Sequence, residues 1–174
     1  VGLLLRADKI PAIKSHYGSD RLLIAADKIG ECGLKFICDE EDSPVFGQPI
    51  ALWNLRTRSA YGYGFNYTPA DAGFLVGWAW IPMYEALNKN EYIDAAKVYI
   101  QSTDKLVDQF GLVPHHYSPT SGEWNNYTNN ESAFAMESYA EMYRVTKDKQ
   151  YLEAGKKYMK PFMEIFQRDD GLWQ

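Results

Sequence analysis

Two acidic side chains, Asp71 and Glu131, stand where two apolar helices are predicted to begin, a placement suited to acid–base chemistry. Asp71 follows Thr68 and Pro69, a helix-capping residue and a residue favoured at the first helical position. Glu131 follows Asn130, another capping type. Two carboxylates in one cleft can divide into a protonated acid and an ionised base, as glycosidic-bond chemistry requires. Alternatively, these acids only offset the positive end of a helix dipole.

Two long connections precede these helices and carry the other candidate side chains. Residues 38–69 and 111–129 each exceed the roughly 12–15 residues of ordinary structureless loops. Both are rich in aromatic rings, which stack on the C–H faces of sugars, and in Arg, His and amide groups, which hydrogen-bond to hydroxyls and carboxylates. The candidate substrate-binding residues are Trp53, Arg56, Arg58, Tyr63, His115, His116, Trp124 and Asn126. The alternative is that the rings only hold the long loops in place.

Metal and cofactor chemistry find no support in the sequence. His115 and His116 are adjacent, and adjacent side chains rarely ligate one ion without a further cluster of ligands. One of these histidines is expected instead to hydrogen-bond to substrate. The sequence contains no phosphate-binding glycine loop and no recognisable Ser/His/Asp arrangement, so no metal and no cofactor is expected.

An internal repeat determines how these candidates are positioned. The segment 83–92 resembles 142–151 at an offset of 142 − 83 = 59 residues, and the match continues through 93–97 and 152–156. A fainter copy lies at 22–26, which is 70 residues before 92–96. Under the 59-residue offset Asp71 falls on Asn130, next to Glu131. The repeat therefore predicts that the two carboxylates occupy equivalent positions on successive helices.

Each repeat unit is predicted to contain two helices of different character. The second helix carries one apolar stripe at helical spacing, with charged residues between, so it faces water on one side. In the first unit the stripe consists of Tyr92, Ala95, Ala96, Tyr99, Thr103, Leu106, Val107 and Phe110. The first helix is apolar almost all round over 74–83, and nearly so over 133–143, which predicts enclosure on all sides. Pro82 and Pro161 predict a kink or an early helix end.

Alternating enclosed and water-facing helices are typical of a double-layered ring of helical hairpins. The sequence therefore predicts an all-α fold with a single domain over 1–174, an (α/α) toroid of which about half of a six-hairpin (α/α)6 barrel is present. A helical solenoid is the competing fold, but its units usually have only about 34 to 47 residues.

Composition excludes several classes of partner. Of the 174 residues 46% are hydrophobic and 24% are charged, as in an ordinary globular domain. The net charge of −5 argues against a nucleic-acid surface, and no segment has the roughly 18 apolar residues of a membrane span. Cys32 and Cys38 are expected on one helix, six residues apart and so on different faces, as buried thiols without a disulfide.

Several segments resemble the unsaturated uronyl hydrolases, the glucuronyl and rhamnogalacturonyl enzymes built as six-hairpin toroids. The resemblance covers roughly 69–174. It rests on Asp71-Ala72-Gly73-Phe74, on Gly111-Leu112-Val113-Pro114-His115, on Trp124 before the next inner helix, and on the closing segment 166–174.

The resemblance implies hydration of the 4,5 double bond that polysaccharide lyases leave on a terminal uronic acid. Asp71 matches the acid that protonates the vinyl ether carbon and activates water, and His115 matches a substrate-binding histidine. The expected partner is an oligosaccharide substrate. Because such a toroid has about six hairpins and about three are read here, the remainder of a longer chain is expected as a further partner.

Two other functions stay open at this point. A polysaccharide lyase on the same kind of fold would use His115-His116-Tyr117 and Asn125-Asn126-Tyr127 to neutralise a uronate and move its C5 proton. A non-catalytic helical-repeat scaffold would use neither Asp71 nor Glu131 for chemistry.

Overall fold

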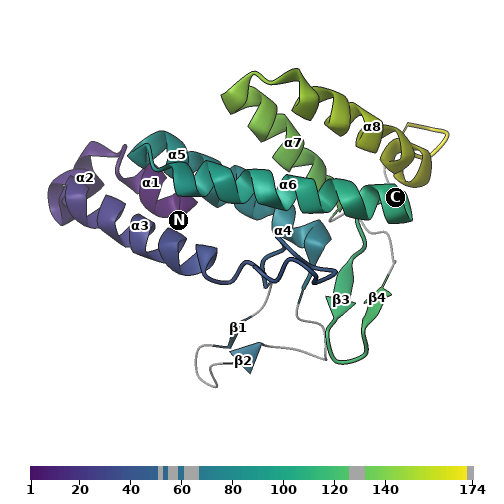
Figure 1. Ribbon diagram of the computed structural model, residues 1–174. Coiled ribbons are helices and arrows are strands. Elements are labelled where there is room, and N and C mark those ends of the chain that lie inside the picture. The colour runs from purple at the N-terminus through teal and green to yellow at the C-terminus, as the bar shows by residue number, and fades with distance from the viewer. Residues whose placement is uncertain (51–52, 55–58, 61–66, 126–131, 172–174) are drawn as a thin grey trace.

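The chain folds into helical hairpins with two small β-hairpins at one side, as Figure 1 shows. The computed structural model describes residues 1–50, 53–54, 59–60, 67–125 and 132–171. The elements are α1 (Gly2–Ala7), α2 (Pro11–Tyr17), α3 (Ser19–Leu34), β1 (Trp53–Asn54), β2 (Ser59–Ala60), α4 (Pro69–Leu75), the π-helix η1 (Val76–Trp80), α5 (Ile81–Leu87), α6 (Asn90–Phe110), β3 (His116–Ser118), β4 (Glu123–Asn125), α7 (Ser132–Thr146) and α8 (Lys149–Phe166). The predicted predominance of helix is confirmed.

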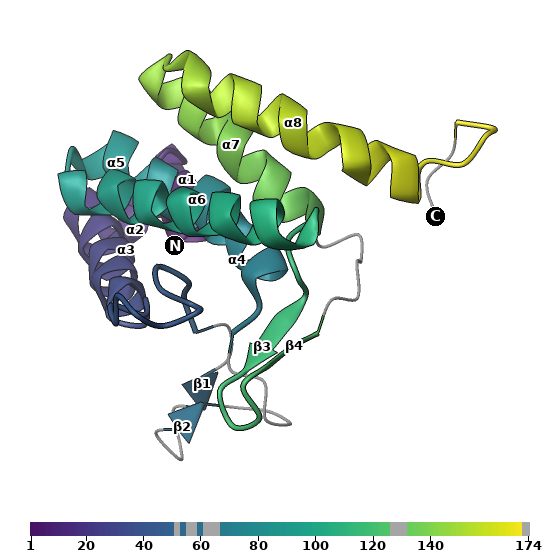
Figure 2. The same cartoon turned by 45° about the vertical axis from the view of Figure 1, so that its right-hand side comes forward.

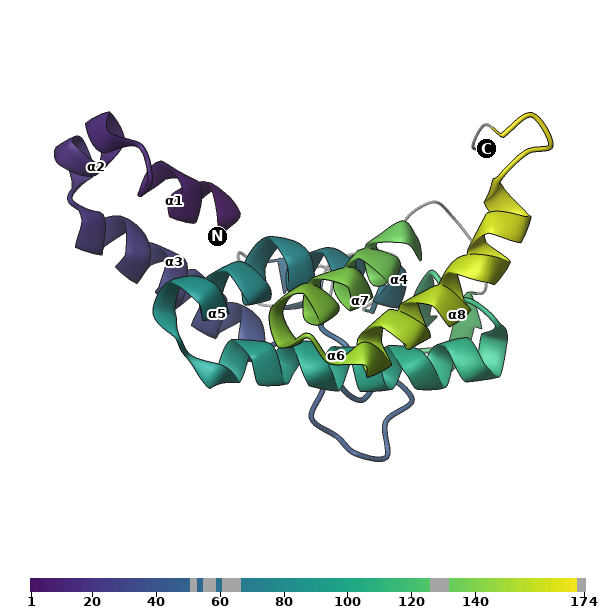
Figure 3. The ribbon, with the colours of Figure 1, turned by 90° about the horizontal axis from the view of Figure 1, so that it is seen from above.

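Three helical hairpins follow one another along the described part of the chain. In each, a longer second helix, called outer below, packs back on an earlier segment, called inner: α3 on α1, α6 on α5 and α8 on α7. The inner segments also pack on one another, α1 against α5 and α4 against α7. Figure 3 shows α6 running along the inner segment α4–α5. None of the helices in the described part of the chain is both long and apolar enough to cross a bilayer.

The repeat predicted from the sequence appears in the backbone where the inner helices end. Asn88 and Lys147, which are equivalent under the 59-residue offset, both have positive φ, 55° and 60°. Their amides donate to the carbonyls of Tyr84 and Tyr143, at 2.8 and 2.9 Å. No other described residue except glycine has a positive φ. A left-handed residue just beyond a helix is a common way to end it, so both hairpins turn by the same device.

The inner helices run in the same direction and meet at successive positions. Near their starts, Gly73 lies against the backbone of Phe134. Further along, the indole Nε1 of Trp78 donates to Oε1 of Glu137 at 3.0 Å. Near their ends, Arg144 donates two hydrogen bonds to the Glu85 carboxylate, at 2.8 and 2.9 Å. Because later residues of one helix meet later residues of the other, α4 and α7 begin at the same end of the molecule.

Two buried tyrosines of the outer helices are anchored at the starts of the inner helices. Tyr99 on α6 donates its hydroxyl to the carbonyl of Pro69 at 2.8 Å. Tyr158 on α8, its equivalent under the 59-residue offset, donates to the carbonyl of Ser132 at 3.4 Å. The predicted apolar stripe of α6 is confirmed, because its residues from Tyr92 to Val107 are buried. Outer helices thus fix where the inner helices begin.

The predicted equivalence of Asp71 and Asn130 stays a prediction, because Asn130 lies outside the described residues. Trp78 meets Glu137 at the 59-residue offset, whereas Gly73 meets Phe134, two residues away from that offset. The π-helix between Gly73 and Trp78 accounts for part of this difference, because its wider turns contain extra residues.

The prediction that the first inner helix is enclosed on all sides is wrong. Phe74 is 38% exposed and Trp78 is 58% exposed. In the same helical segment Ala70, Ala72 and Gly73 are buried. A run of apolar residues shows that a helix avoids water in some assembly, but it does not show which neighbour covers each face.

The two prolines behave differently from each other. Pro82 follows the π-helix, so the α-helix is interrupted before it and resumes at Ile81. A proline has no N–H to donate to the preceding turn, which suits this irregular backbone. Pro161 lies inside α8, which continues to Phe166, so of the kink or early end predicted there the early end is excluded.

The cysteine prediction is partly wrong. Both thiols are free, but Cys32 is exposed, and Cys38 lies beyond the end of α3 at Leu34. Helix α3 thus ends earlier than the sequence pattern predicts, with Lys35 as its C-cap.

We expect Gly73→Ala to lower the free energy of unfolding by about 2 kcal/mol or more, as overpacking does at a close contact. A methyl group there would collide with the backbone of Phe134 and Ala135, which cannot yield as a flexible side chain would. Urea unfolding followed by circular dichroism measures the change.

Gly33→Ala is the matched control, because nothing lies within 4 Å of the added methyl group. In helix α3 it should leave stability unchanged or raise it by about 0.5–1 kcal/mol. Equal effects of the two substitutions would contradict the close approach of α4 and α7.

Candidate functional site

The two long connections meet beside the start of α4. The amide of Tyr117 on β3 donates to the carbonyl of Tyr67 at 2.9 Å, and Tyr67 also forms a β-bridge with Ile50. Figure 2 shows both β-hairpins on the same side of the helices, below α4. The hydrogen bond at Tyr67, just before Thr68, thus joins the second predicted substrate-binding loop to the end of the first. Tyr67 was not predicted as a site residue, and Tyr117 was predicted only for the lyase alternative.

Asp71 lies in the first turn of α4 and is partly exposed, whereas its neighbours Ala70 and Ala72 are buried. Its carboxylate is close enough to the core to act on Tyr99, whose pKa is raised mainly by burial, with a further contribution from the charge of Asp71. Thr68 is the N-cap residue, as predicted, but its side chain makes no capping hydrogen bond. Asp71 therefore stands at a boundary between the core and the loops.

His115 and His116 form a closely spaced pair at the base of the β3–β4 hairpin. Their Nδ1 atoms are 2.7 Å apart, so one ring donates a hydrogen bond and the other accepts it. Burial lowers the pKa of His116, and the neighbouring His115 lowers it further. Nε2 of His116 is buried and has no hydrogen-bond partner among the described residues. At neutral pH a neutral His116 suits this pair to accept or relay a proton.

Trp124 is held in an aromatic cluster. Its ring centroid lies 4.8 Å from that of Tyr117 across the hairpin and 5.7 Å from that of Phe110 at the end of α6. These contacts hold the hairpin against the helices. Of the two roles considered for loop aromatics, the contacts of Trp124 favour a structural one.

The remaining predicted residues fall partly or wholly outside the described residues. Trp53 is described only through its backbone, which pairs with Ala60. The other predicted residues outside the described ranges are Arg56, Arg58, Tyr63, Asn126 and Glu131.

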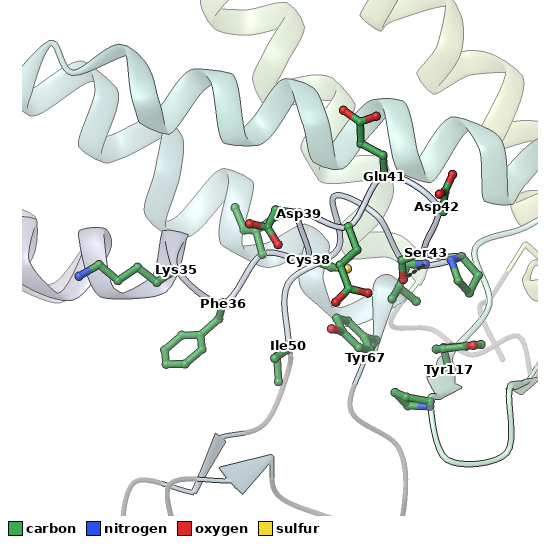
Figure 4. A pocket seen from close by; sticks show the side chains of 15 residues that line it. Lys35, Phe36, Cys38, Asp39, Glu41, Asp42, Ser43, Ile50, Tyr67 and Tyr117 are labelled. Atoms are coloured by element: carbon green, nitrogen blue, oxygen red, sulfur yellow. Dashed lines mark hydrogen bonds between the residues drawn. The ribbon is translucent and has the colours of Figure 1, made fainter.

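A cavity of about 910 Å³ opens next to this region, and it was not predicted from the sequence. It is lined mainly by the turn 35–45, which contains four consecutive acids at 39–42, and by Tyr67 and Tyr117. Figure 4 shows Tyr67 below Cys38, with the carboxylates of Glu41 and Asp42 directed away from the ring. The run of acids was the available sequence signal.

The acidic turn makes this cavity electronegative. Burial raises the pKa of Tyr67 to about 12, with contributions from Cys38, Glu40 and Asp39. Such a lining repels anions, so the cavity does not suit a uronate carboxylate. Asp71, His115 and His116 do not line it.

A second cavity of about 230 Å³ lies between α6, α7 and α8. Its two carboxylates already have partners: Asp104 accepts from the hydroxyl of Tyr139 at 2.6 Å, and Asp108 pairs with Lys157 at 2.6 Å. Burial raises the pKa of Asp104. We assign this cavity to the packing of the outer helices.

Within the described ranges, no three His, Cys, Asp or Glu side chains lie close enough together to hold a metal ion. No family model matches the chain, and no curated protein matches it. The function of the chain is therefore inferred from the geometry at the start of α4.

The histidine pair gives a pH prediction. Because the folded pKa of His116 is below the ordinary 6.5, the folded state binds fewer protons than the unfolded state in the interval between the two values. Its contribution to stability is therefore complete above pH 6.5 and is lost as the pH falls through the folded pKa. Titration of the imidazole signals by NMR should place the pKa of His116 below 6.5, and His115→Ala should raise it.

His16→Ala, which removes an imidazole from the exposed helix α2, is the control and should leave the titration of His116 unchanged. A His116 pKa at or above 6.5 in the folded protein would contradict the buried pair.

Proposed function

We propose that this chain is a glycoside hydrolase acting on unsaturated uronic-acid oligosaccharides, with its hairpins arranged as part of an (α/α) toroid. The observation that carries the proposal is the joining of the β3–β4 hairpin to Tyr67, four residues before Asp71, by the hydrogen bond from Tyr117. A carboxylate that is partly exposed and a closely spaced histidine pair thereby belong to one end of the molecule. The resemblance to the uronyl hydrolases supplies the substrate class.

The parallel inner helices support the toroid in this proposal. In a ring of hairpins every inner helix runs in the same direction and every loop before an inner helix opens on the same rim. The contacts of Gly73 and Glu85 with α7 agree with that direction. Glu131 immediately precedes Ser132, where α7 begins, and in the proposal it is the second carboxylate of the rim.

In the proposed reaction Asp71 is the acid and base. Its carboxyl proton goes to C4 of the unsaturated sugar, and the electron pair of the C4–C5 double bond forms the new C–H bond. Water then bonds to C5 and returns a proton to the Asp71 carboxylate. The resulting hemiketal opens and releases the rest of the oligosaccharide. His115 or His116 hydrogen-bonds to the substrate near the ring being hydrated.

A lyase acting on a uronic-acid polymer is the second candidate, and one observation favours it. The lowered pKa of His116 keeps that imidazole neutral at neutral pH, the form needed to remove a C5 proton. A lyase creates the double bond that the hydrolase consumes. The two reactions are therefore opposite in their effect on ultraviolet absorbance.

We expect the chain to lower the ultraviolet absorbance of an unsaturated uronide, because hydration removes the conjugated double bond. Asp71→Asn cannot give up a proton and should reduce the rate by about 10²–10⁴-fold, the usual contribution of acid–base catalysis. The measurement follows absorbance with an unsaturated disaccharide and, separately, with an intact uronic-acid polymer.

Asp94→Asn is the control, because Asp94 is an exposed acid on α6 that pairs with Lys97. It should keep full activity. A rise in absorbance with the intact polymer would show that the chain is a lyase and not a hydrolase. If a protein shown to be folded changes the absorbance of neither substrate, the chain is a non-catalytic scaffold.

A further inference from the structure

Three aromatic rings form an exposed platform on the inner helices, and none of them belongs to the site described above. The aromatic platform consists of Phe74 on α4, Trp78 on η1 and Phe134 on α7. Each pair of ring centroids is 6.2 Å apart. Phe74 is 38% exposed and Trp78 is 58% exposed, so water contacts much of their surface. Large rings left in water in mutual contact suggest a binding surface.

The angles between the rings determine what shape fits the aromatic platform. The interplanar angles are 68°, 72° and 78°, so the rings meet edge to face and do not form a flat strip. A flat group can therefore stack on the broad face of only one ring, and Trp78 is the most exposed of the three residues. Its indole is fixed in orientation, because Nε1 donates to Oε1 of Glu137 at 3.0 Å. The surface suits one flat apolar group rather than several in a row.

Charges beside the aromatic platform are predominantly negative. Glu137 touches Trp78, and Glu141 lies one turn further along α7. Arg144 is already paired with Glu85 at 2.8 Å and with Glu141 at 2.9 Å, and the charge of Lys9 also acts on Glu85. The charged group in contact with the indole of Trp78 is the Glu137 carboxylate. Anionic groups are repelled here, whereas hydroxyl groups can donate to the carboxylate oxygens.

We propose that the aromatic platform binds one neutral pyranose residue of a glycan, with its C–H face on the indole of Trp78 and a hydroxyl donating to Glu137. The choice of a glycan rests on the proposed function. A neutral sugar combines an apolar face with hydrogen-bond donors and carries no charge, which matches both properties of this surface. A uronate residue of the same glycan fits poorly because of its carboxylate.

A second copy of the chain is a poorer occupant of the aromatic platform. In a symmetric dimer through this face, the glutamates of one copy would approach those of the other, and like charges brought together at an interface are costly.

The position of the aromatic platform relative to Asp71 also favours a glycan. Seven residues separate Asp71 from Trp78, which corresponds to roughly 10 Å along a helix. A short oligosaccharide can span that distance.

The test is an NMR titration of the indole N–H signal of Trp78 in the full chain. The probes are cellotetraose, which is neutral, and tetragalacturonate, which is acidic. Cellotetraose should shift the signal and bind more tightly than tetragalacturonate. Trp78→Ala, followed through the remaining signals, should weaken cellotetraose binding by about tenfold or more, and Phe74→Ala should also weaken it.

Two further variants sharpen the test. Met159→Ala removes an exposed apolar side chain from α8, 44% exposed, and should leave binding unchanged. Glu137→Gln removes the charge but keeps an oxygen that accepts from the indole. It should retain cellotetraose binding and reduce the difference between the two sugars.

Failure of this inference and failure of the proposed function are distinguishable. If cellotetraose leaves the Trp78 signal unmoved while the chain consumes unsaturated uronides, the inference is overturned and the hydrolase stands. If the sugar binds but no double bond is consumed, the inference is supported and the hydrolase is overturned. Broadening of the Trp78 signal with protein concentration, without sugar, would assign the surface to a second copy and overturn the inference.

Discussion

The close approach of α4 and α7 at Gly73 is the contact on which the arrangement of this molecule depends. Without a side chain at Gly73, the backbone of one inner helix reaches the backbone of the other at Phe134 and Ala135. Small residues allow helices to approach in this way, and the contact fixes both spacing and direction. Trp78 and Glu137, and then Glu85 and Arg144, meet because the helices already lie together at their starts. The common direction of the inner helices follows from that contact.

The sequence predicted the features that depend on local periodicity. The apolar stripe of α6 has the spacing of a helix buried on one side, and the structure buries it. The duplicated hairpin ends at Asn88 and Lys147 could be found because both units keep similar residues around them. Such features are determined by residues within about twenty positions of one another, the range over which sequence patterns are strongest.

The features that depend on distant neighbours could not be predicted in the same way. Exposure of Trp78 is decided by what packs on the inner layer, and the apolar run around Trp78 looks the same whether or not a neighbour is present. The pairing of Tyr67 with Tyr117 joins two residues that the 59-residue repeat does not relate. The acidic turn at 39–42 was visible as composition, but only the fold makes it the wall of a cavity.

The π-helix at 76–80 has a consequence for the direction of the Asp71 carboxylate. Each residue of an α-helix turns the chain by about 100° around the axis, so one additional residue in a regular helix would rotate everything before it by that angle. The wider turn of a π-helix takes up an additional residue within the turn itself, so α4 and α5 keep nearly the relative phase of an uninterrupted helix. Gly73 thereby stays at the crossing with α7. The wide turn thus preserves the azimuth of the carboxylate, although it lies more than a helical turn away from it.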